Sequence, residues 1–336
     1  MLRTVTPVQS PARSPVVSVI MPAHNAAAYL REAVDSAIAQ SFTDFELLII
    51  DDCSTDGTLA LARRLADRDE RLRVLARPTR GGAAAARNVG IREARGAYFA
   101  LLDSDDIWLP TFLAAQMEIL TLRPGVDVVS GNAFNLGGGR HGQPLSSVAS
   151  DCRPIQLIDM LEREDAVCIM SVLRRSVYER VGGFDETMAC SEDYDYWIRA
   201  ALAGCRFVQN PVPLAHYRRR ADSASSDEIG MLQAIMTVLR RARARCANVP
   251  DAVAVIDRQI ARFEEQRLLA RAKANLLGRE FASAAHEFDE LFELRPSFVN
   301  GVMARVSRYV PSALLWAYRT KSAIRSARVR SAAPSS

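Results

Sequence analysis

The stretch Tyr98-Phe-Ala-Leu-Leu-Asp-Ser-Asp-Asp106 places three carboxylates directly after a short, largely apolar run. A run of this kind that ends in a polar turn predicts a buried strand. The carboxylates would then lie at the end of the strand, where open α/β sheets place their ligands. Their oxygens are hard ligands that suit Mg²⁺ or Mn²⁺. Taken alone, the stretch also fits a solvated acidic turn.

A second group of carboxylates lies upstream, after another apolar run. The run Phe45-Glu-Leu-Leu-Ile-Ile50 predicts a strand and is followed at once by Asp51-Asp-Cys-Ser-Thr-Asp-Gly57. This segment begins like a calcium-binding loop, but its twelfth position, where a bidentate Glu is needed, is Arg63. A turn followed by a helix that begins near Thr58 fits better. Two acidic strand ends about fifty residues apart suit successive βα units of one sheet.

Composition limits the class of protein. A length of 336 residues predicts one large domain and a smaller one, and 49% hydrophobic with 24% charged residues is typical of a globular chain. The net charge of +4 is too small to indicate nucleic acid as the main partner. The six cysteines include no C-x-x-C pair, and no segment has the roughly 18 apolar residues of a membrane-spanning helix. We therefore expect a cytoplasmic protein with reduced thiols.

Strand and helix patterns alternate through the first two-thirds of the chain. Residues 16–21, 72–75 and 126–130 predict further strands, and the alternation predicts an α/β fold. The pair Gly81-Gly82 opens an Ala-rich helical run, but it is not a G-x-G-x-x-G motif, so a dinucleotide-binding fold is poorly supported. We expect residues 131–150, which contain three consecutive glycines, to form a loop.

The third acidic element is Ser191-Glu-Asp193, which opens a predicted helix over residues 194–202. The helix dipole would lower the pKa of carboxylates in this first turn and keep them ionised. A helix N-cap with no further role is the alternative interpretation. Trp197 and Ile198 are more simply explained as core residues.

In their order, these segments resemble the inverting, family 2-type nucleotide-sugar glycosyltransferases of the GT-A fold. The resemblance covers roughly residues 15–220. It implies an α/β fold with a mixed, mostly parallel sheet flanked by helices. The stretches that carry it are Val17-Ser-Val-Ile-Met-Pro-Ala-His-Asn25, Asp51–Gly57, Gly81–Ile91 with Ala86-Arg-Asn-Val-Gly90, Asp103–Asp106, and Gly182-Gly-Phe-Asp-Glu186 with Glu192-Asp193.

The resemblance also implies a donor site. The base would be bound through Asp52, which accepts a hydrogen bond from it. Two positions depart from the family pattern, Cys53 where Gly is usual and His24 where Tyr is common. The residues expected to contact the nucleotide are Pro22, Ala23, Asn25, Asp51 and Asp52.

The resemblance assigns the chemistry to the other carboxylates. Asp103 and Asp105 would form the D-x-D that holds the donor diphosphate through Mn²⁺ or Mg²⁺, with Asp106 as a third candidate ligand. Asp193 would deprotonate the acceptor hydroxyl, which is general-base catalysis. A metal bound to the diphosphate would stabilise the negative charge of the leaving group.

Two cationic or titratable positions have two interpretations each. Arg87 is placed for a donor contact, and an ion pair with a strand-end aspartate explains it equally well. His216 would reach the metal or the phosphates, or would simply pack at a strand end.

Beyond about residue 225 the pattern is helical. Residues 276–296 resemble one tetratricopeptide-type helix pair, which is below the roughly three repeats of an independent array. No acidic residue follows Glu293, while basic residues accumulate. This tail predicts peripheral contact with an anionic membrane, and a solvated basic helix is the alternative. The apolar side of the segment would be Leu314, Leu315, Trp316, Tyr318 and Ile324.

The sequence thus predicts a flexible terminus over residues 1–14, a catalytic GT-A domain over 15–222 and a helical C-terminal region over 223–336. We expect a metal-dependent inverting transfer of sugar from a nucleoside-diphosphate donor to a glycan or lipid-linked glycan acceptor. One alternative is a catalytically inert GT-A-like scaffold or binding module. Another is a sugar nucleotidyltransferase, but Pro22-Ala-His-Asn25 is not the Gly-rich basic phosphate loop that it would need.

Overall fold

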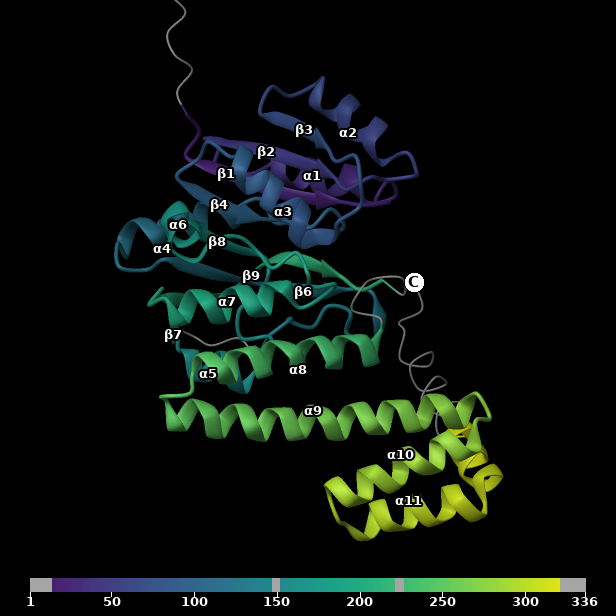
Figure 1. The fold of residues 1–336 in the computed structure, drawn as a ribbon. Coiled ribbons are helices and arrows are strands. Elements are labelled where there is room, and N and C mark those ends of the chain that lie inside the picture. Colours follow the sequence, from purple (N-terminus) through teal and green to yellow (C-terminus); the bar gives the residue numbers. More distant parts are fainter. Residues whose placement is uncertain (1–13, 147–151, 221–226, 321–336) are drawn as a thin grey trace, which may run out of the picture. The chain divides into compact units, whose positions relative to one another are not determined.

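The protein is described by a computed structural model that covers residues 14–146, 152–220 and 227–320. The chain divides into two compact units (Figure 1). Of the flexible terminus predicted over residues 1–14, all but residue 14 lies outside the described residues, as does the part of the basic tail beyond residue 320. The domain limits at residues 14 and 222 stay a prediction, because a division into compact units does not show which part of the chain folds by itself. Among the described residues, the first unit holds 14–136, 142–146, 152–156 and 165–218, and the second holds 137–141, 157–164, 219–220 and 227–320.

One mixed sheet forms the first unit. Its order is β3-β2-β1-β4-β8-β6-β9-β5, and β7 pairs with β9. Strands β1 to β4 are parallel to one another, as are β6 and β9, whereas β5, β7 and β8 pair antiparallel. The strands are β1 (Val17–Ala23), β2 (Phe45–Asp51), β3 (Leu72–Ala76), β4 (Tyr98–Leu101), β5 (Ile107–Trp108), β6 (Val128–Leu136), β7 (Pro154–Ile155), β8 (Ser171–Arg174) and β9 (Phe207–Arg218).

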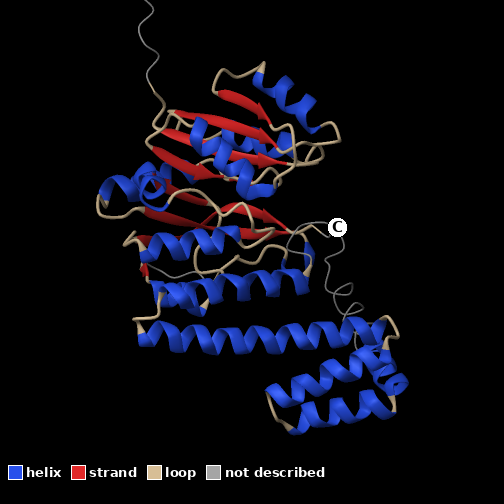
Figure 2. Ribbon diagram, viewed as in Figure 1, coloured by secondary structure: helices blue, strands red, loops and turns tan. Residues whose placement is uncertain are grey.

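Helices cover both faces of this sheet (Figure 2). On one face, alternate residues of β1 such as Val19 and Met21 share a core with α1, α2 and α4. On the other face, Ile20 lies against α3. Every residue of β1 and β2 is buried, as expected for parallel strands covered on both sides. The helices are α1 (Leu30–Ile38), α2 (Thr58–Ala66), α3 (Gly82–Glu93), α4 (Phe112–Leu122), α6 (Arg175–Val181) and α7 (Glu192–Leu202).

Gly90 lets α3 approach the sheet closely. A Cβ added at this position would lie 2.7 Å from both Ile20 Cγ2 and Ile50 Cδ1, closer than carbon atoms can pack. A larger residue would push the helix away from β1 and β2. The glycine therefore fixes the distance between the sheet and the helix that carries Arg87.

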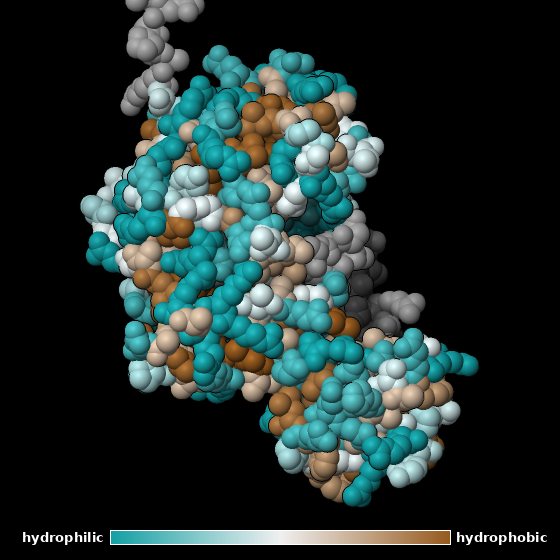
Figure 3. All heavy atoms as spheres, in the orientation of Figure 1, coloured by the Kyte–Doolittle hydropathy of each residue, from teal (hydrophilic) through white to brown (hydrophobic). Residues whose placement is uncertain are grey.

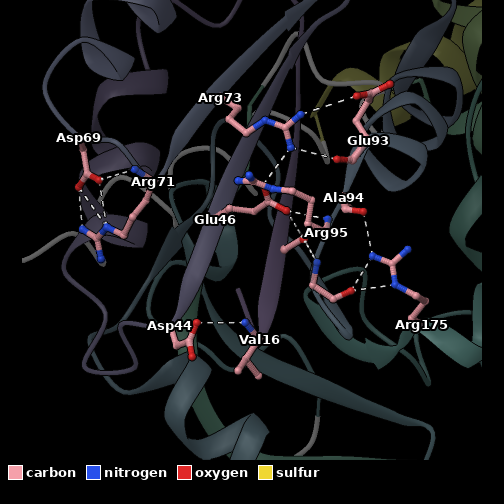
Figure 4. Close-up of polar contacts among 12 residues, drawn as sticks. Val16, Asp44, Glu46, Asp69, Arg71, Arg73, Glu93, Ala94, Arg95 and Arg175 are labelled. Atoms are coloured by element: carbon pink, nitrogen blue, oxygen red, sulfur yellow. Dashed lines mark hydrogen bonds and ion pairs between the residues drawn. The ribbon is translucent and has the colours of Figure 1, made fainter. Parts of the chain in front are cut away.

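A buried carboxylate joins three strands at the amino end of β2 (Figure 4). Glu46 accepts hydrogen bonds from Ser18 Oγ at 2.7 Å, the backbone N–H of Arg95 at 2.7 Å and the Arg73 guanidinium at 2.9 Å. Burial raises the pKa of Glu46, but these hydrogen bonds outweigh it and leave the pKa below its usual value. Glu46 therefore has a structural role, because these hydrogen bonds connect β2 to Ser18 of β1, to Arg73 of β3 and to Arg95.

The α/β, mostly parallel architecture predicted from the sequence is confirmed, and two boundaries differ from expectation. The first strand continues through Pro22 to Ala23. Pro22 lies opposite Ile50 in the register with β2, at the end of the strand, where a missing N–H is tolerated. The expectation of a loop over residues 131–150 was wrong for its first part, because β6 continues to Leu136 beside β9.

The second unit is helical. Its largest contacts join α9 to α8 and α10, and α10 to α11, in chain order. Within the α9–α11 part, a core forms around Leu276, Phe288 and Ala304. The expected helix pair over residues 276–296 corresponds to the end of α9 and to α10. The helices are α5 (Leu157–Glu162), α8 (Glu228–Arg245), α9 (Pro250–Leu277), α10 (Phe281–Leu294) and α11 (Phe298–Tyr309), with a 3₁₀ turn over Gly138–Arg140.

The expected apolar face near residue 315 is partly wrong. Leu314 and Leu315 are buried in the core of the second unit, and Tyr318 packs against that core. Of the predicted set, Trp316 is exposed, and Ile324 lies outside the described residues. Among the described residues, no helix has the length and apolar character needed to cross a bilayer.

Candidate active site

The turn after β2 brings the first predicted donor-binding residues together. Asn25 Oδ1 accepts a hydrogen bond from the Thr55 N–H at 2.9 Å, which joins the ends of β1 and β2. Asn25 and Cys53 both have positive φ, 48° and 56°. Glycine adopts a positive φ more easily than other residues, which explains why it is usual at this position in the family. Cys53 has the same backbone conformation here. His24 Nδ1 lies 2.8 Å from the Asp52 carbonyl oxygen.

Asp51 and Asp52 have different surroundings. Asp52 pairs with Arg77 and accepts hydrogen bonds from the Gly81 and Gly82 backbone N–H groups at 3.0 and 2.7 Å. Asp51 is also buried, and its Oδ1 has no hydrogen-bond partner among the described residues. Sequence reasoning did not single out Arg77 or these two amides. The only signal was the Gly81-Gly82 pair at the start of a helix.

The Asp103–Asp106 turn follows β4, as predicted. Asp106 is 1% exposed, its Oδ1 accepts a hydrogen bond from the Arg218 N–H at 2.8 Å, and its Oδ2 has no partner in the part of the chain that the structure describes. Burial, and then repulsion from Asp103 and Asp105, raise the pKa of Asp106 well above its usual value. Arg218 also donates from Nε to the Asp105 carbonyl oxygen at 2.8 Å, so one residue of β9 holds the turn twice.

Arg87 bridges two of the predicted acidic elements. Its guanidinium donates to Asp103 Oδ1 at 2.6 Å and to Glu192 Oε1 at 2.5 Å, and the side chain is 3% exposed. Burial disfavours the charged guanidinium, but Asp103 and Glu192 raise its pKa further than burial lowers it. The ion pair with a strand-end aspartate is therefore confirmed, and the donor contact of Arg87 stays a prediction. Glu192 is a partner that the sequence did not reveal.

Asp193 lies in the first turn of α7, and its pKa differs from expectation. Burial and then the neighbouring charge of Glu192 raise the pKa of Asp193 to about 7, although Arg87 and the Tyr194 N–H act in the opposite direction. The expected lowering by the helix dipole was wrong, because it is smaller than the cost of burial beside like charges. A carboxyl with this pKa is suited to accept a proton near neutral pH.

Aromatic packing holds α7 in place. The ring of Tyr196 stacks on Phe184 with centroids 4.3 Å apart, and Trp197 meets Phe207 edge-on. Trp197 and Ile198 are buried, as expected for core residues. The loop that carries Phe184 is fixed to α3 in turn, because the Asn88 side-chain amide bonds both its N–H and its carbonyl.

His216 lies on β9, opposite Ile107 of β5. Its ring approaches Phe134 with centroids 6.2 Å apart. Within the described residues, no group of three or more His, Cys, Asp or Glu side chains is arranged to hold a metal ion. His216 and the aspartates therefore form no preformed cage, and their role as metal ligands stays a prediction.

The acidic turn nevertheless fits a hard divalent cation. Asp103, Asp105 and Asp106 supply only oxygen donors, and the unpartnered Oδ2 of Asp106 is an acceptor without a donor among the described residues. Mg²⁺ and similar ions are often bound by one or two carboxylates together with substrate phosphates, so a complete protein cage is not required.

Cys168 lies near the same carboxylates. Burial raises the pKa of its thiol, and the charges of Asp106 and Asp193 add to this effect. Its backbone N–H donates to Ser130 Oγ at 2.9 Å. No sequence pattern pointed to this position, since the residue precedes β8 and lies outside every acidic motif.

The comparison with known sequences identifies the family. Residues 18–182 match the family described as glycosyl transferase family 2. The chain is 31% identical over 215 residues to the putative teichuronic acid biosynthesis glycosyltransferase TuaG of Bacillus subtilis, and the match covers 64% of this chain and 83% of TuaG. The chain belongs to glycosyl transferase family 2.

Two further relatives are longer than the part that matches. An uncharacterized glycosyltransferase of Rickettsia prowazekii is 30% identical over 194 residues, which are 55% of this chain and 58% of that protein. The O-antigen biosynthesis protein RfbC of Myxococcus xanthus is 29% identical over 66% of this chain and 17% of its own length. The chain thus spans little more than half of the Rickettsia protein and a small part of RfbC.

Solved structures with low sequence identity share the fold of this family 2 protein. TarS 1-349 of S. aureus, in complex with UDP-GlcNAc, superposes with a TM-score of 0.63 at 20% identity, covering 91% of this chain and 92% of that one. The mannosyltransferase PcManGT of Pyrobaculum calidifontis, in complex with GDP-Man and Mn²⁺, gives 0.57 at 20% identity, covering 96% and 87%. The fold is of the GT-A type.

Proposed function

We propose that this family 2 enzyme transfers a sugar from a nucleoside-diphosphate donor to an acceptor hydroxyl with inversion, and that Asp193 is the general base. The observation that carries this proposal is the raised pKa of Asp193, about 7, beside the Asp103–Asp106 turn. Arg87 connects the two elements, since it binds Asp103 on one side and Glu192 on the other.

The proposed reaction is a single displacement. Asp193 takes the proton of the acceptor hydroxyl while the acceptor oxygen bonds to the anomeric carbon. The bond from this carbon to the diphosphate oxygen breaks, and the nucleoside diphosphate leaves with the electron pair. One base is sufficient, because no covalent sugar–enzyme intermediate forms, in contrast to a retaining glycosidase. General-base catalysis of this kind contributes about 10²–10⁴-fold in rate.

The donor would be bound at the carboxyl ends of β1, β2 and β4. A cation held by Asp103, Asp105 and Asp106, with His216 as a further candidate, would neutralise charge on the diphosphate when it is bound. The ion proposed is Mn²⁺ or Mg²⁺. Support comes from the all-oxygen donor set and from the Mn²⁺ in the PcManGT complex. The base would be recognised by the residues of the β1 and β2 ends, which are Pro22, Ala23, Asn25, Asp51 and Asp52.

A surface glycan or a lipid-linked glycan is the proposed acceptor. The support is the similarity to proteins named for teichuronic acid and O-antigen biosynthesis. A cytoplasmic location is part of the proposal, and all six cysteines are free, as expected in a reducing compartment.

The test is release of nucleoside diphosphate from a panel of UDP-, GDP- and dTDP-sugars with Mn²⁺, Mg²⁺ or EDTA. Water replaces the missing acceptor, so slow hydrolysis reveals the donor. We expect one donor to be hydrolysed in a reaction that needs both the metal and Asp105, so that Asp105→Ala abolishes it. Asp67→Ala, on the surface after α2, is the matched control and should leave the rate unchanged.

The other outcomes favour the alternatives. Failure of every donor to bind or react would favour an inert scaffold. Formation of a sugar nucleotide from nucleoside triphosphate and sugar phosphate would favour a nucleotidyltransferase instead.

A further inference from the structure

Helix α11 has an unusual distribution of side chains. Its core side carries Ala304 and Ser307, which are buried, and Met303 and Val306, which pack against the core of the second unit. Large apolar residues point outward, with Phe298 88% and Tyr309 75% exposed. An amphipathic helix of a globular protein normally keeps its large apolar residues on the core side and polar residues on the opposite side. The outward apolar side chains are therefore not explained by the folding of this unit.

The outward residues form one stripe. Phe298, Val302, Arg305 and Tyr309 are spaced at i, i+4, i+7 and i+11, which places them on the same side of an α-helix. We call these four residues the α11 stripe. Val310 and Trp316 are exposed next in the chain, at 53% and 70%. Figure 3 shows hydrophobic side chains in brown among hydrophilic ones on the visible face of the α10–α11 region.

The sequence that follows α10 carries charge of one sign only. From Leu294 to the last residue the sequence has eight basic residues and no acidic one. The basic residues are Arg295, Arg305, Arg308, Arg319, Lys321, Arg325, Arg328 and Arg330. Exposed aromatic and aliphatic side chains next to arginine and lysine are the combination that binds the surface of an anionic bilayer. A second copy of the chain would instead bring like charges together, which opposes association.

We propose that the α11 stripe is a membrane-docking surface whose apolar side chains enter the headgroup region of an anionic bilayer. The arginine side chains would extend along the apolar surface and reach the lipid phosphates. This surface is not the one expected from the sequence, because Leu314 and Leu315 are used in the core. The inference does not depend on the proposed sugar transfer, since the stripe contains none of the residues placed in the active site.

The experiment is sedimentation of the full chain with vesicles of phosphatidylcholine alone or mixed with phosphatidylglycerol. We expect binding to the anionic vesicles that weakens with salt. Replacement of Phe298, Val302 and Tyr309 by Gln should reduce the partition coefficient at least about tenfold. The matched control replaces Leu122 and Val212, exposed apolar residues of the first unit, by Gln and should bind as the wild type does.

A second pair of variants tests the charge. Arg305→Gln with Arg319→Gln should weaken binding to anionic vesicles roughly 30-fold, since each basic residue near such a surface contributes about fivefold. Arg63→Gln with Arg64→Gln on α2 removes the same charge elsewhere and should have little effect. Arg308 is left in place because it pairs with Asp289.

Three results would overturn the proposal. These are equal binding to neutral and anionic vesicles, undiminished binding of the α11 triple variant, or a dimer in size-exclusion chromatography that this variant loses while vesicles bind neither protein. Circular dichroism of each variant shows that the fold is retained. Donor hydrolysis without vesicles should be the same in the triple variant and the wild type, so failure of either proposal can be recognised separately.

Discussion

The carboxylates at the two ends of strand β2 differ in their hydrogen bonding. At the amino end, buried Glu46 receives hydrogen bonds from Ser18, Arg73 and Arg95, and its pKa is lowered. At the carboxyl end, Asp51 Oδ1 has no hydrogen-bond partner among the described residues. In the turn after β4, which is separated from β2 by β1 in the sheet, the pKa of buried Asp106 is raised.

The difference lies in the number of donors that the fold supplies. Burial raises the pKa of both Glu46 and Asp106, but only Glu46 has enough donors to reverse the effect. At the amino end of β2, the hydrogen bonds of Glu46 are all made within the protein and contribute to its stability. At the carboxyl ends of β2 and β4, carboxylate oxygens of Asp51 and Asp106 remain able to accept a bond from a ligand. Such an arrangement is expected where function opposes stability.

Asp193→Asn is expected to have the largest effect on this comparison. Loss of the proposed base should lower the rate of donor hydrolysis by about 10²–10⁴-fold, while donor affinity changes little. The rate is measured by nucleoside-diphosphate release and the affinity by calorimetry. Hydrolysis at the wild-type rate would exclude Asp193 as the base.

The same variant should be more stable than the wild type. The pKa of Asp193 in the folded state, about 7, lies above the ordinary value of 3.8, so the carboxyl loses its proton less readily when folded. Stability therefore falls as the pH rises between these values, and Asn removes this cost. We expect a gain of about 1–3 kcal/mol at pH 8 in urea unfolding. A less stable variant would contradict the raised pKa.

Glu46→Gln should have the opposite consequence, with lower stability and unchanged donor affinity. Breaking a buried ion pair costs about 3–5 kcal/mol, and Arg73 and Arg95 can return partly to water, so we expect a loss of about 2–3 kcal/mol. The pKa of Glu46 is lowered on folding, so this contribution is present above pH 4.5 and is lost as the pH falls through the folded-state pKa. Urea unfolding at two pH values measures both effects.

Asp69→Asn is the control for this variant. The Asp69 side chain is 17% exposed, against 2% for Glu46, so loss of its ion pair with Arg71 should cost less than about 1 kcal/mol. An equal loss of unfolding free energy in the two variants would show that the hydrogen bonds of Glu46 stabilise the protein no more than a surface ion pair does.

The pH dependence of donor hydrolysis tests the role of Asp193 in a second way. With Asp193 as base, donor hydrolysis should rise about tenfold per pH unit below pH 7 and level off above it, because only the ionised carboxylate accepts the proton. The measurement is the rate at saturating donor and Mg²⁺ over this range. The same rise in Asp193→Asn would assign it to another group.

Arg218 should have the smallest effect, because it acts through the Asp105–Asp106 turn. Arg218→Ala is expected to raise the KM for the donor roughly fivefold with little change in kcat, as for the loss of about one hydrogen bond. Arg218→Lys should restore part of the loss. An equal rise in KM for the substitution of the next residue, Arg219→Ala, would instead indicate that these consecutive arginines contact the diphosphate directly.

Several elements could be predicted because their signals are local. The apolar runs before Asp51 and Asp103 predicted β2 and β4, and the fold class followed from the alternation of strands and helices. The strand continuing through residues 131–136 was missed, because its pairing with β9 depends on residues about eighty positions away. No local pattern contains such pairing.

The amino-acid sequence was enough to predict the family, the fold class and the acidic elements at the ends of β2 and β4 and at the start of α7. These follow from apolar periodicity and from the order of short motifs. The tertiary structure alone decided that Arg87 joins Asp103 to Glu192, that Leu314 and Leu315 are buried, and that Asp193 has a raised rather than a lowered pKa. The physical reason is that burial, ion pairing and electrostatic repulsion depend on distances between residues far apart in the chain.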